Sequence, residues 1–84
     1  MSREELMIKL KEIVKPYVKD VEGFNNINED SDFLKDLKIN SANLIDVILD
    51  IETAFDIVID NASMEKMLTV RSAIEIITTK LSEK

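Results

Sequence analysis

Ser41 stands where a loop is expected to give way to a helix, directly after Asn40. A Ser or Asn at such a point most often caps the helix, because its side-chain oxygen accepts a hydrogen bond from a free backbone N–H. The same position also suits a phosphate group, because free N–H groups and the positive end of the helix dipole face it. Ser41 is therefore either a structural cap residue or the attachment point of a phosphoester.

The chain offers Ser41 no obvious activating base. It contains no His and no Cys, which excludes Ser-His and Cys-His nucleophile pairs, thiol catalysis, disulfides and the usual zinc sites. A calcium loop that began at Asp30 would place Lys35 where Gly is needed and Ser41 where a bidentate Glu belongs. Paired-carboxylate catalysis has no support, because the candidate acids line a solvated helix face. We therefore expect no catalytic residue and no metal site, and if Ser41 reacts, another enzyme must supply the catalysis.

The net charge of −6 is concentrated in one block of the chain. No Lys or Arg lies between Ile39 and Glu65, whereas the rest of the chain has as many acidic as basic residues. A surface of this sign repels phosphate backbones, so neither nucleic acid nor an anionic membrane is an expected partner. The block favours docking to basic partner proteins, with solubility as the alternative reading. Its acids are Asp46, Asp50, Glu52, Asp56, Asp60 and Glu65.

The elements that must position these residues belong to one small all-α domain spanning residues 1–84. The chain is 45% hydrophobic and has a single Gly and a single Pro, which indicates a compact helical bundle. Its longest apolar runs, such as Val47-Ile48-Leu49, are too short to span a membrane. No apolar segment typical of a signal peptide follows Met1. A monomer in the cytoplasm is the expected state.

We expect three main helices and one short helix. The first begins with a possible capping box at Ser2 and ends or kinks near Pro16. A long loop from Asp20 to Ile39 follows, and the second helix runs from about Ser41 to Phe55. The core stripes of the first, second and last helices comprise Leu6, Leu10, Ile13, Val14 and Tyr17; Leu44, Val47, Ile48, Ile51 and Phe55; and Val70, Ala73, Ile74, Ile77 and Leu81.

The segment after the second helix is less regular. Alternation from Asp56 to Asn61 is typical of extended backbone, so a short strand is possible there. A helix of one to two turns is expected from about Ser63 to Met67, and Thr69 is expected to cap the last helix.

The second helix has an apolar strip away from its core stripe. At 100° per residue, Ile45 and Leu49 lie on the same outer flank as Ala42. Asp46 and Asp50 lie beyond them, while Glu52 and Asp56 border the strip nearer the core. An apolar centre with a charged rim is typical of a contact surface, although a wide apolar face can also indicate deep burial.

These residues together resemble the acyl carrier protein family. The resemblance covers nearly the whole chain in length, helical layout, long first loop and acidic second helix. Its most specific part runs from Phe33 to Ile59. The pattern is Phe33-x-x-Asp36-Leu37-x-x-Asn40-Ser41-x-x-x-Ile45-Asp46-Val47, followed by Glu52-x-x-Phe55-x-Ile57-x-Ile59.

The resemblance implies a carrier of the four-helix acyl-carrier type rather than an enzyme. The family's matching Ser is esterified with 4'-phosphopantetheine by a separate Mg-dependent phosphopantetheinyl transferase that uses coenzyme A. The arm's thiol then carries acyl intermediates as thioesters between enzymes of fatty-acid, lipid or polyketide-like synthesis. On Ser41 this cofactor would supply the sulfur that the chain lacks.

The resemblance also implies partner and pocket residues. The acidic second helix would dock basic patches on the transferase and on acyl-loading and acyl-processing enzymes. The residues expected at this docking surface are Asn40, Ala42, Ile45, Asp46, Leu49, Asp50, Glu52 and Asp56. Those expected to line an acyl pocket, unless they are simply core, are Val47, Ile51, Ile59, Met64 and Ile74.

Three residues depart from the family pattern. Asn40 replaces the usual Asp, Ala42 replaces the usual Leu, and Thr53 stands where many members have a second consecutive acid. These changes lead to the hypothesis of a specialised carrier with its own partner enzymes. Two alternatives stay open at this point: a peptidyl or aminoacyl carrier, and a carrier-like adaptor that is never modified.

Overall fold

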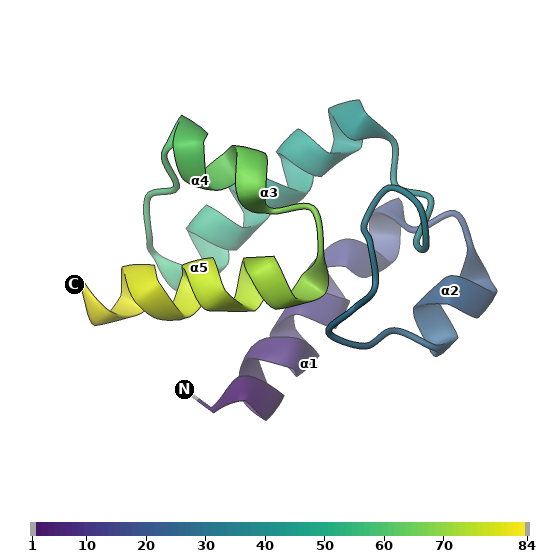
Figure 1. Ribbon diagram of the computed structural model, residues 1–84, viewed down its shortest axis with the longest axis horizontal. Helices are drawn as coiled ribbons and strands as arrows, with labels where there is room; N and C mark the ends of the chain where they lie inside the picture. Colours follow the sequence, from purple (N-terminus) through teal and green to yellow (C-terminus); the bar gives the residue numbers. More distant parts are fainter. Residues whose placement is uncertain (1, 84) are drawn as a thin grey trace.

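The computed structural model describes residues 2–83, so Met1 and Lys84 of the expected domain lie outside the described residues. Three long helices and two short ones make up most of it (Figure 1). Over the described range the only β pairing is an isolated bridge between Asp32 and Thr69. The elements in order are α1 (Arg3–Val14), a 3-10 turn η1 (Lys15–Tyr17), α2 (Val21–Asn25), α3 (Ser41–Phe55), α4 (Asn61–Lys66) and α5 (Val70–Ser82).

Ser2 and Pro16 determine where α1 begins and ends. The hydroxyl of Ser2 accepts a hydrogen bond from the N–H of Glu5 at 3.2 Å, as a capping residue does. Pro16 lies in η1, where the backbone tightens into a 3-10 turn. The chain then leaves the helix axis at Val18, in extended conformation. This confirms the expected start and end of the first helix.

The core forms between α1, α3 and α5. All five residues of the expected α3 stripe, from Leu44 to Phe55, are buried, and α3 has the bounds that its pattern predicts. The stripes of α1 and α5 are confirmed except at their edges, where Ile13, Tyr17 and Leu81 are only partly buried and pack against the core. Each long helix therefore buries one face and leaves its other face to solvent.

The long first loop contains a short helix that the sequence pattern does not predict. Asp20 caps α2 by accepting a hydrogen bond from the N–H of Gly23 at 3.1 Å. The N–H groups of Lys19 and Asp20 both approach the carbonyl oxygen of Leu37, at 3.2 and 3.4 Å. These bonds attach α2 to the end of the loop that leads into α3. Figure 1 shows α2 at one side of the molecule and both chain termini at the other.

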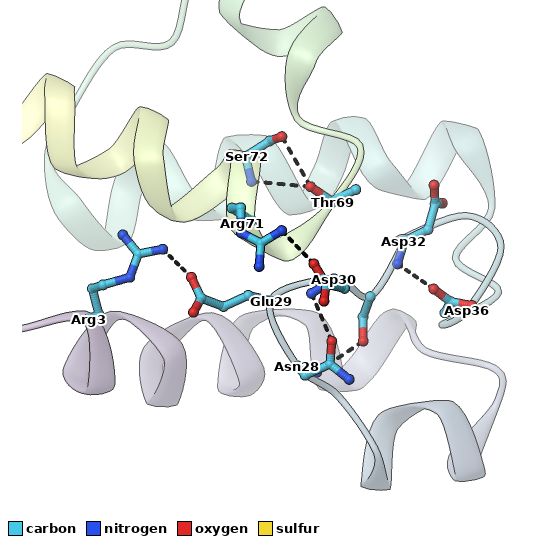
Figure 2. Close-up of polar contacts among 10 residues, drawn as sticks. Arg3, Asn28, Glu29, Asp30, Asp32, Asp36, Thr69, Arg71 and Ser72 are labelled. Atoms are coloured by element: carbon cyan, nitrogen blue, oxygen red, sulfur yellow. Dashed lines mark hydrogen bonds and ion pairs between the residues drawn. The ribbon is translucent and has the colours of Figure 1, made fainter.

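The middle of the loop is held by charged residues from two helices (Figure 2). Arg3 of α1 pairs with Glu29, and Arg71 of α5 pairs with Asp30 at 2.5 Å. Backbone bonds join the same regions, because the N–H of Phe33 donates to Leu68 at 2.9 Å. The loop is therefore fixed against the start of α5 and is not a free connection.

The segment between α3 and α4 forms no strand in the structure. Residues 56–60 are irregular, and Asp56 ends α3 in the left-handed conformation with a φ of 54°. The following helix begins at Asn61, two residues earlier than predicted. Its earlier start has a local cause, because Asp60 caps it through the N–H of Ser63 at 3.3 Å. Thr69 caps α5 as expected, accepting from the N–H of Ser72 at 3.2 Å.

No helix within residues 2–83 is both long enough and apolar enough to cross a membrane.

Candidate functional site

Ser41 is the first residue of α3 and is exposed to solvent. The backbone before it is fixed by Lys38, whose φ of 57° turns the chain, and by Ile39, which is buried. The N–H of Ile39 donates to the carbonyl oxygen of Phe33 at 3.0 Å. On the other side, Leu44 is anchored in the core. Ser41 is thus an exposed hydroxyl held between two buried residues.

Asn40 is the N-cap of α3. Its side-chain oxygen accepts from the N–H of Ala42 at 2.8 Å, and its backbone oxygen accepts from Leu44 at 2.9 Å. Both Asn40 and Ala42 are exposed. The capping role expected at the Asn40-Ser41 pair therefore falls on Asn40, which leaves the hydroxyl of Ser41 outside the cap.

The position of Ser41 is compatible with a phosphodiester on its oxygen. The start of α3 has no acidic residue in its first turn, so the positive end of the helix dipole is not cancelled there. The neighbouring Lys38 is exposed and basic, whereas the first acid of the helix is Asp46. Within residues 2–83, no group of three or more His, Cys, Asp or Glu side chains is arranged to hold a metal ion.

The apolar strip of α3 is on the surface. Ile45 and Leu49 are each 51% exposed, so deep burial does not explain them. Asp46 and Asp50, which flank them, are exposed as well. We call these four residues the outer face of α3. It combines an apolar centre with negative charge, as the sequence pattern predicts, although its role in docking stays a prediction.

Asp50 receives a hydrogen bond that the sequence analysis missed. The hydroxyl of Tyr17, in η1, donates to Oδ2 of Asp50 at 2.8 Å. This hydrogen bond raises the pKa of Tyr17 above its ordinary value of 10.0, and burial and the charges of Asp50 and Asp46 raise it further. The sequence contained one indication of this bond: a tyrosine on a core-facing stripe still needs a hydrogen-bond partner for its hydroxyl.

Glu52 and Asp56 have intramolecular roles. A carboxylate oxygen of Glu52 accepts from the N–H of Ile59 at 2.7 Å, which holds the connection between α3 and α4. Asp56 occupies the C-cap position of α3. Glu52 is partly buried, whereas Asp56 is exposed. The structure thus gives Glu52 a structural task beside the docking role expected for it.

The residues expected to line an acyl pocket belong mainly to the core. Val47, Ile51, Ile59 and Ile74 are buried, and Met64 packs against them with part of its side chain exposed. Ile74 also lines a groove of about 410 Å³ at the surface, but its neighbours there are different. They are Arg3, Glu4, Met7, Ile8 and Glu29. The acyl pocket therefore stays a prediction.

Comparisons with known proteins match this chain over nearly its whole length. Residues 12–77 match the family model described as the phosphopantetheine attachment site. The acyl carrier protein of Thermotoga maritima is 32% identical over 80 residues, which cover 95% of this chain and 96% of that protein. The acyl carrier protein of Coprothermobacter proteolyticus is 31% identical over 84 residues, covering all of both chains.

A solved structure agrees with these sequence matches. The crystal structure of the acyl carrier protein from Thermotoga maritima superposes with a TM-score of 0.81 and 31% sequence identity. The superposition covers 99% of this chain and 94% of that one. The family consists of carriers rather than catalysts, and its fold is the all-α bundle described above. The chain therefore belongs to the acyl carrier protein family and contains its phosphopantetheine attachment domain.

Proposed function

We propose that Ser41 is esterified with 4'-phosphopantetheine and that the thiol of this arm carries acyl groups as thioesters between enzymes. The observation that carries the proposal is the exposed hydroxyl of Ser41 at the first position of α3, inside the matched attachment domain. The arm supplies the sulfur that a chain without Cys does not have. Ser41 supplies only the oxygen that is esterified.

The residues around Ser41 position it but do not activate it. Asn40 caps the helix, and Ile39 and Leu44 fix the backbone on both sides. The chain contains no His, so the base that takes the hydroxyl proton belongs to the transferase. Once the ester has formed, the N-terminus of α3 favours the negative charge of the phosphodiester.

The outer face of α3 supports docking of basic partner surfaces. Ile45 and Leu49 provide apolar contact area, while Asp46 and Asp50 provide charge that speeds encounter and fixes register. The expected partners are a phosphopantetheinyl transferase and the acyl-loading and acyl-processing enzymes of fatty-acid, lipid or polyketide-like synthesis. Asn40, Ala42, Glu52 and Asp56 extend the candidate surface at its two ends.

The residues beside Ser41 favour a specialised carrier. Ala42 is exposed and has a small side chain, so it offers little apolar contact next to the attachment point. Asn40 supplies a cap oxygen without the negative charge that an Asp would bring to a transferase and its metal ion. We infer that a dedicated transferase modifies this chain faster than a general one does.

An acyl chain held inside the protein would have to separate core residues. The candidates Val47, Ile51, Ile59 and Ile74 are each no more than 5% exposed in the closed bundle, and Met64 lies at its edge. Because protein cores are close-packed, an acyl group among them requires the helices to move apart. Protection of the thioester from hydrolysis would then accompany a measurable expansion of the bundle.

Intact mass spectrometry tests the attachment directly. The chain is incubated with coenzyme A, Mg²⁺ and a broad-specificity phosphopantetheinyl transferase, beside a Ser41→Ala variant and a Ser63→Ala control. One phosphopantetheine on the wild type and on Ser63→Ala, and none on Ser41→Ala, is the expected result. Addition to Ser41→Ala would refute the assignment. If the wild type stays unmodified with this transferase and with transferases encoded near its own gene, an unmodified adaptor is the better description.

A further inference from the structure

Tyr17 connects the end of the first helix to the outer face of α3. Its ring is partly buried and packs against the core, whereas Asp50 is exposed. The hydrogen bond between the Tyr17 hydroxyl and Asp50 Oδ2, at 2.8 Å, joins residues 33 positions apart in the chain. Because the core restrains the ring, the phenol O–H is a donor in a fixed place. It therefore restrains an acid that solvent would otherwise leave mobile.

We propose that Tyr17 is a positioning residue of the docking surface, holding Asp50 in place for a basic side chain of the partner protein. This inference rests on the proposed function, because it needs the outer face of α3 to be a docking surface. A carboxylate accepts hydrogen bonds at both oxygens, so the bond from Tyr17 to Oδ2 leaves Oδ1 for a Lys or Arg. A side chain ordered in advance loses less entropy when the partner binds.

The contrast with Glu52 shows why Asp50 is the acid concerned. Glu52 accepts a backbone N–H from Ile59, so its bond stabilises the chain connection. Asp50 accepts from a side-chain hydroxyl and lies on the exposed face beside Leu49. The substitution Tyr17→Phe keeps the ring packing and removes only the hydroxyl donor, so its effect on docking can be separated from an effect on folding.

The phenol stays protonated under the conditions in which docking would occur. The bond to Asp50 and the negative charges of Asp50 and Asp46 keep the pKa of Tyr17 above its ordinary value of 10.0. Tyr17 is the chain's single Tyr, and the chain has no Trp. Its ultraviolet absorbance therefore reports on this one contact without interference.

A double-mutant cycle in the transferase reaction tests the proposal. Tyr17→Phe, Asp50→Asn and the double variant are compared with the wild type at low salt, with Val21→Ala as an exposed control on α2. We expect Tyr17→Phe to raise the KM for the carrier about threefold, the order expected for ordering one side chain at an interface. The kcat should not change, because Asp50 lies about 13 Å along the helix axis from Ser41.

The cycle distinguishes positioning from a general structural role. On the Asp50→Asn background, Tyr17→Phe should have no further effect on KM. Tyrosine absorbance should titrate at lower pH in Asp50→Asn than in the wild type, because a charge and a carboxylate acceptor are removed. An equal effect of Tyr17→Phe on both backgrounds would overturn the proposal, as would a KM equal to that of Val21→Ala. Failure of the wild type to be modified by any transferase would instead overturn the proposed function together with this inference.

Discussion

Replacement of Gly23 by Ala should destabilise the protein, although Ala is the better helix former. Gly23 lies inside α2, and an ideal Cβ built on it would be 2.1 Å from the backbone oxygen of Asp36 and 3.1 Å from its carbonyl carbon. Ordinary contacts of this kind begin at about 3.4 Å, so the two segments would have to separate by about 1.3 Å. The obstructing atoms belong to the backbone, so no side-chain rotation can relieve the overlap.

The size of the effect follows from two costs and one gain in the free energy of unfolding. Overpacking costs typically about 1–3 kcal/mol. Separation also strains the two bonds that Lys19 and Asp20 make to Leu37, each worth about 0.5–1.5 kcal/mol. The gain in helix propensity offsets at most about 1 kcal/mol. We therefore expect a net loss of about 2 kcal/mol, which lowers the Tm of a domain of this size by about 10 °C.

Thermal unfolding followed by circular dichroism measures this change. Asn25→Ala is the matched control, because Asn25 is exposed on the same helix and its substitution gains helix propensity without a steric overlap. We expect its Tm to equal or slightly exceed that of the wild type. A Gly23→Ala variant as stable as Asn25→Ala would refute the reasoning, because it would show that the loop can yield without cost.

Three further results are expected. The substitution Asp60→Asn keeps the cap oxygen of α4 but removes the negative charge. The pKa of the Asp60 carboxyl is held below its ordinary value of 3.8, mainly by the side-chain hydrogen bond with Ser63. The positive charge of Lys80 also lowers this pKa, whereas burial opposes the shift. Because the folded-state pKa is lowered, the ionised Asp60 stabilises the fold above pH 3.8, and this stabilisation is lost as the pH falls through the lower folded-state pKa. The wild type should therefore have a higher Tm than Asp60→Asn at pH 6 and should lose this advantage as the pH falls below about 4. Moderate NaCl or Mg²⁺ should raise the Tm by screening the acidic block, and melting that does not depend on salt would show that solvent already screens it. Asn40→Asp combined with Ala42→Leu should speed modification by a general transferase severalfold, and equal rates would remove support for a specialised carrier.

The parts of the fold that follow a strong periodic pattern could be predicted from the sequence. The apolar stripe from Leu44 to Phe55 determines which face of α3 is buried, and the same arithmetic places Ile45 and Leu49 on the surface. Capping residues also allow the starts of helices to be predicted, as Ser2 does for α1 and Thr69 for α5. These features depend on residues close together in the chain, so one sequence contains enough information for them.

Features created by contacts between distant residues could not be predicted in this way. The five residues of α2 are too few to show a periodic pattern, and Gly23 suggests a turn when it is considered alone. In the structure Gly23 is needed because the backbone of Asp36 comes so close. The bond from Tyr17 to Asp50 depends likewise on how η1 packs beside α3. Only the folded arrangement brings these pairs together.

Helix α3 sets the relative positions of the residues in the candidate site. Since the core stripe fixes the rotation of α3, it also fixes the direction in which Ser41, Ile45 and Leu49 point relative to one another. A helix rises about 1.5 Å per residue, so Ile45 lies about 6 Å and Leu49 about 12 Å from Ser41 along the axis. A partner seated on these two side chains therefore meets the serine at a set distance, whichever enzyme it is. If the outer face of α3 docks partners as proposed, burial of the opposite face is what sets the same distance from Ser41 for each of them.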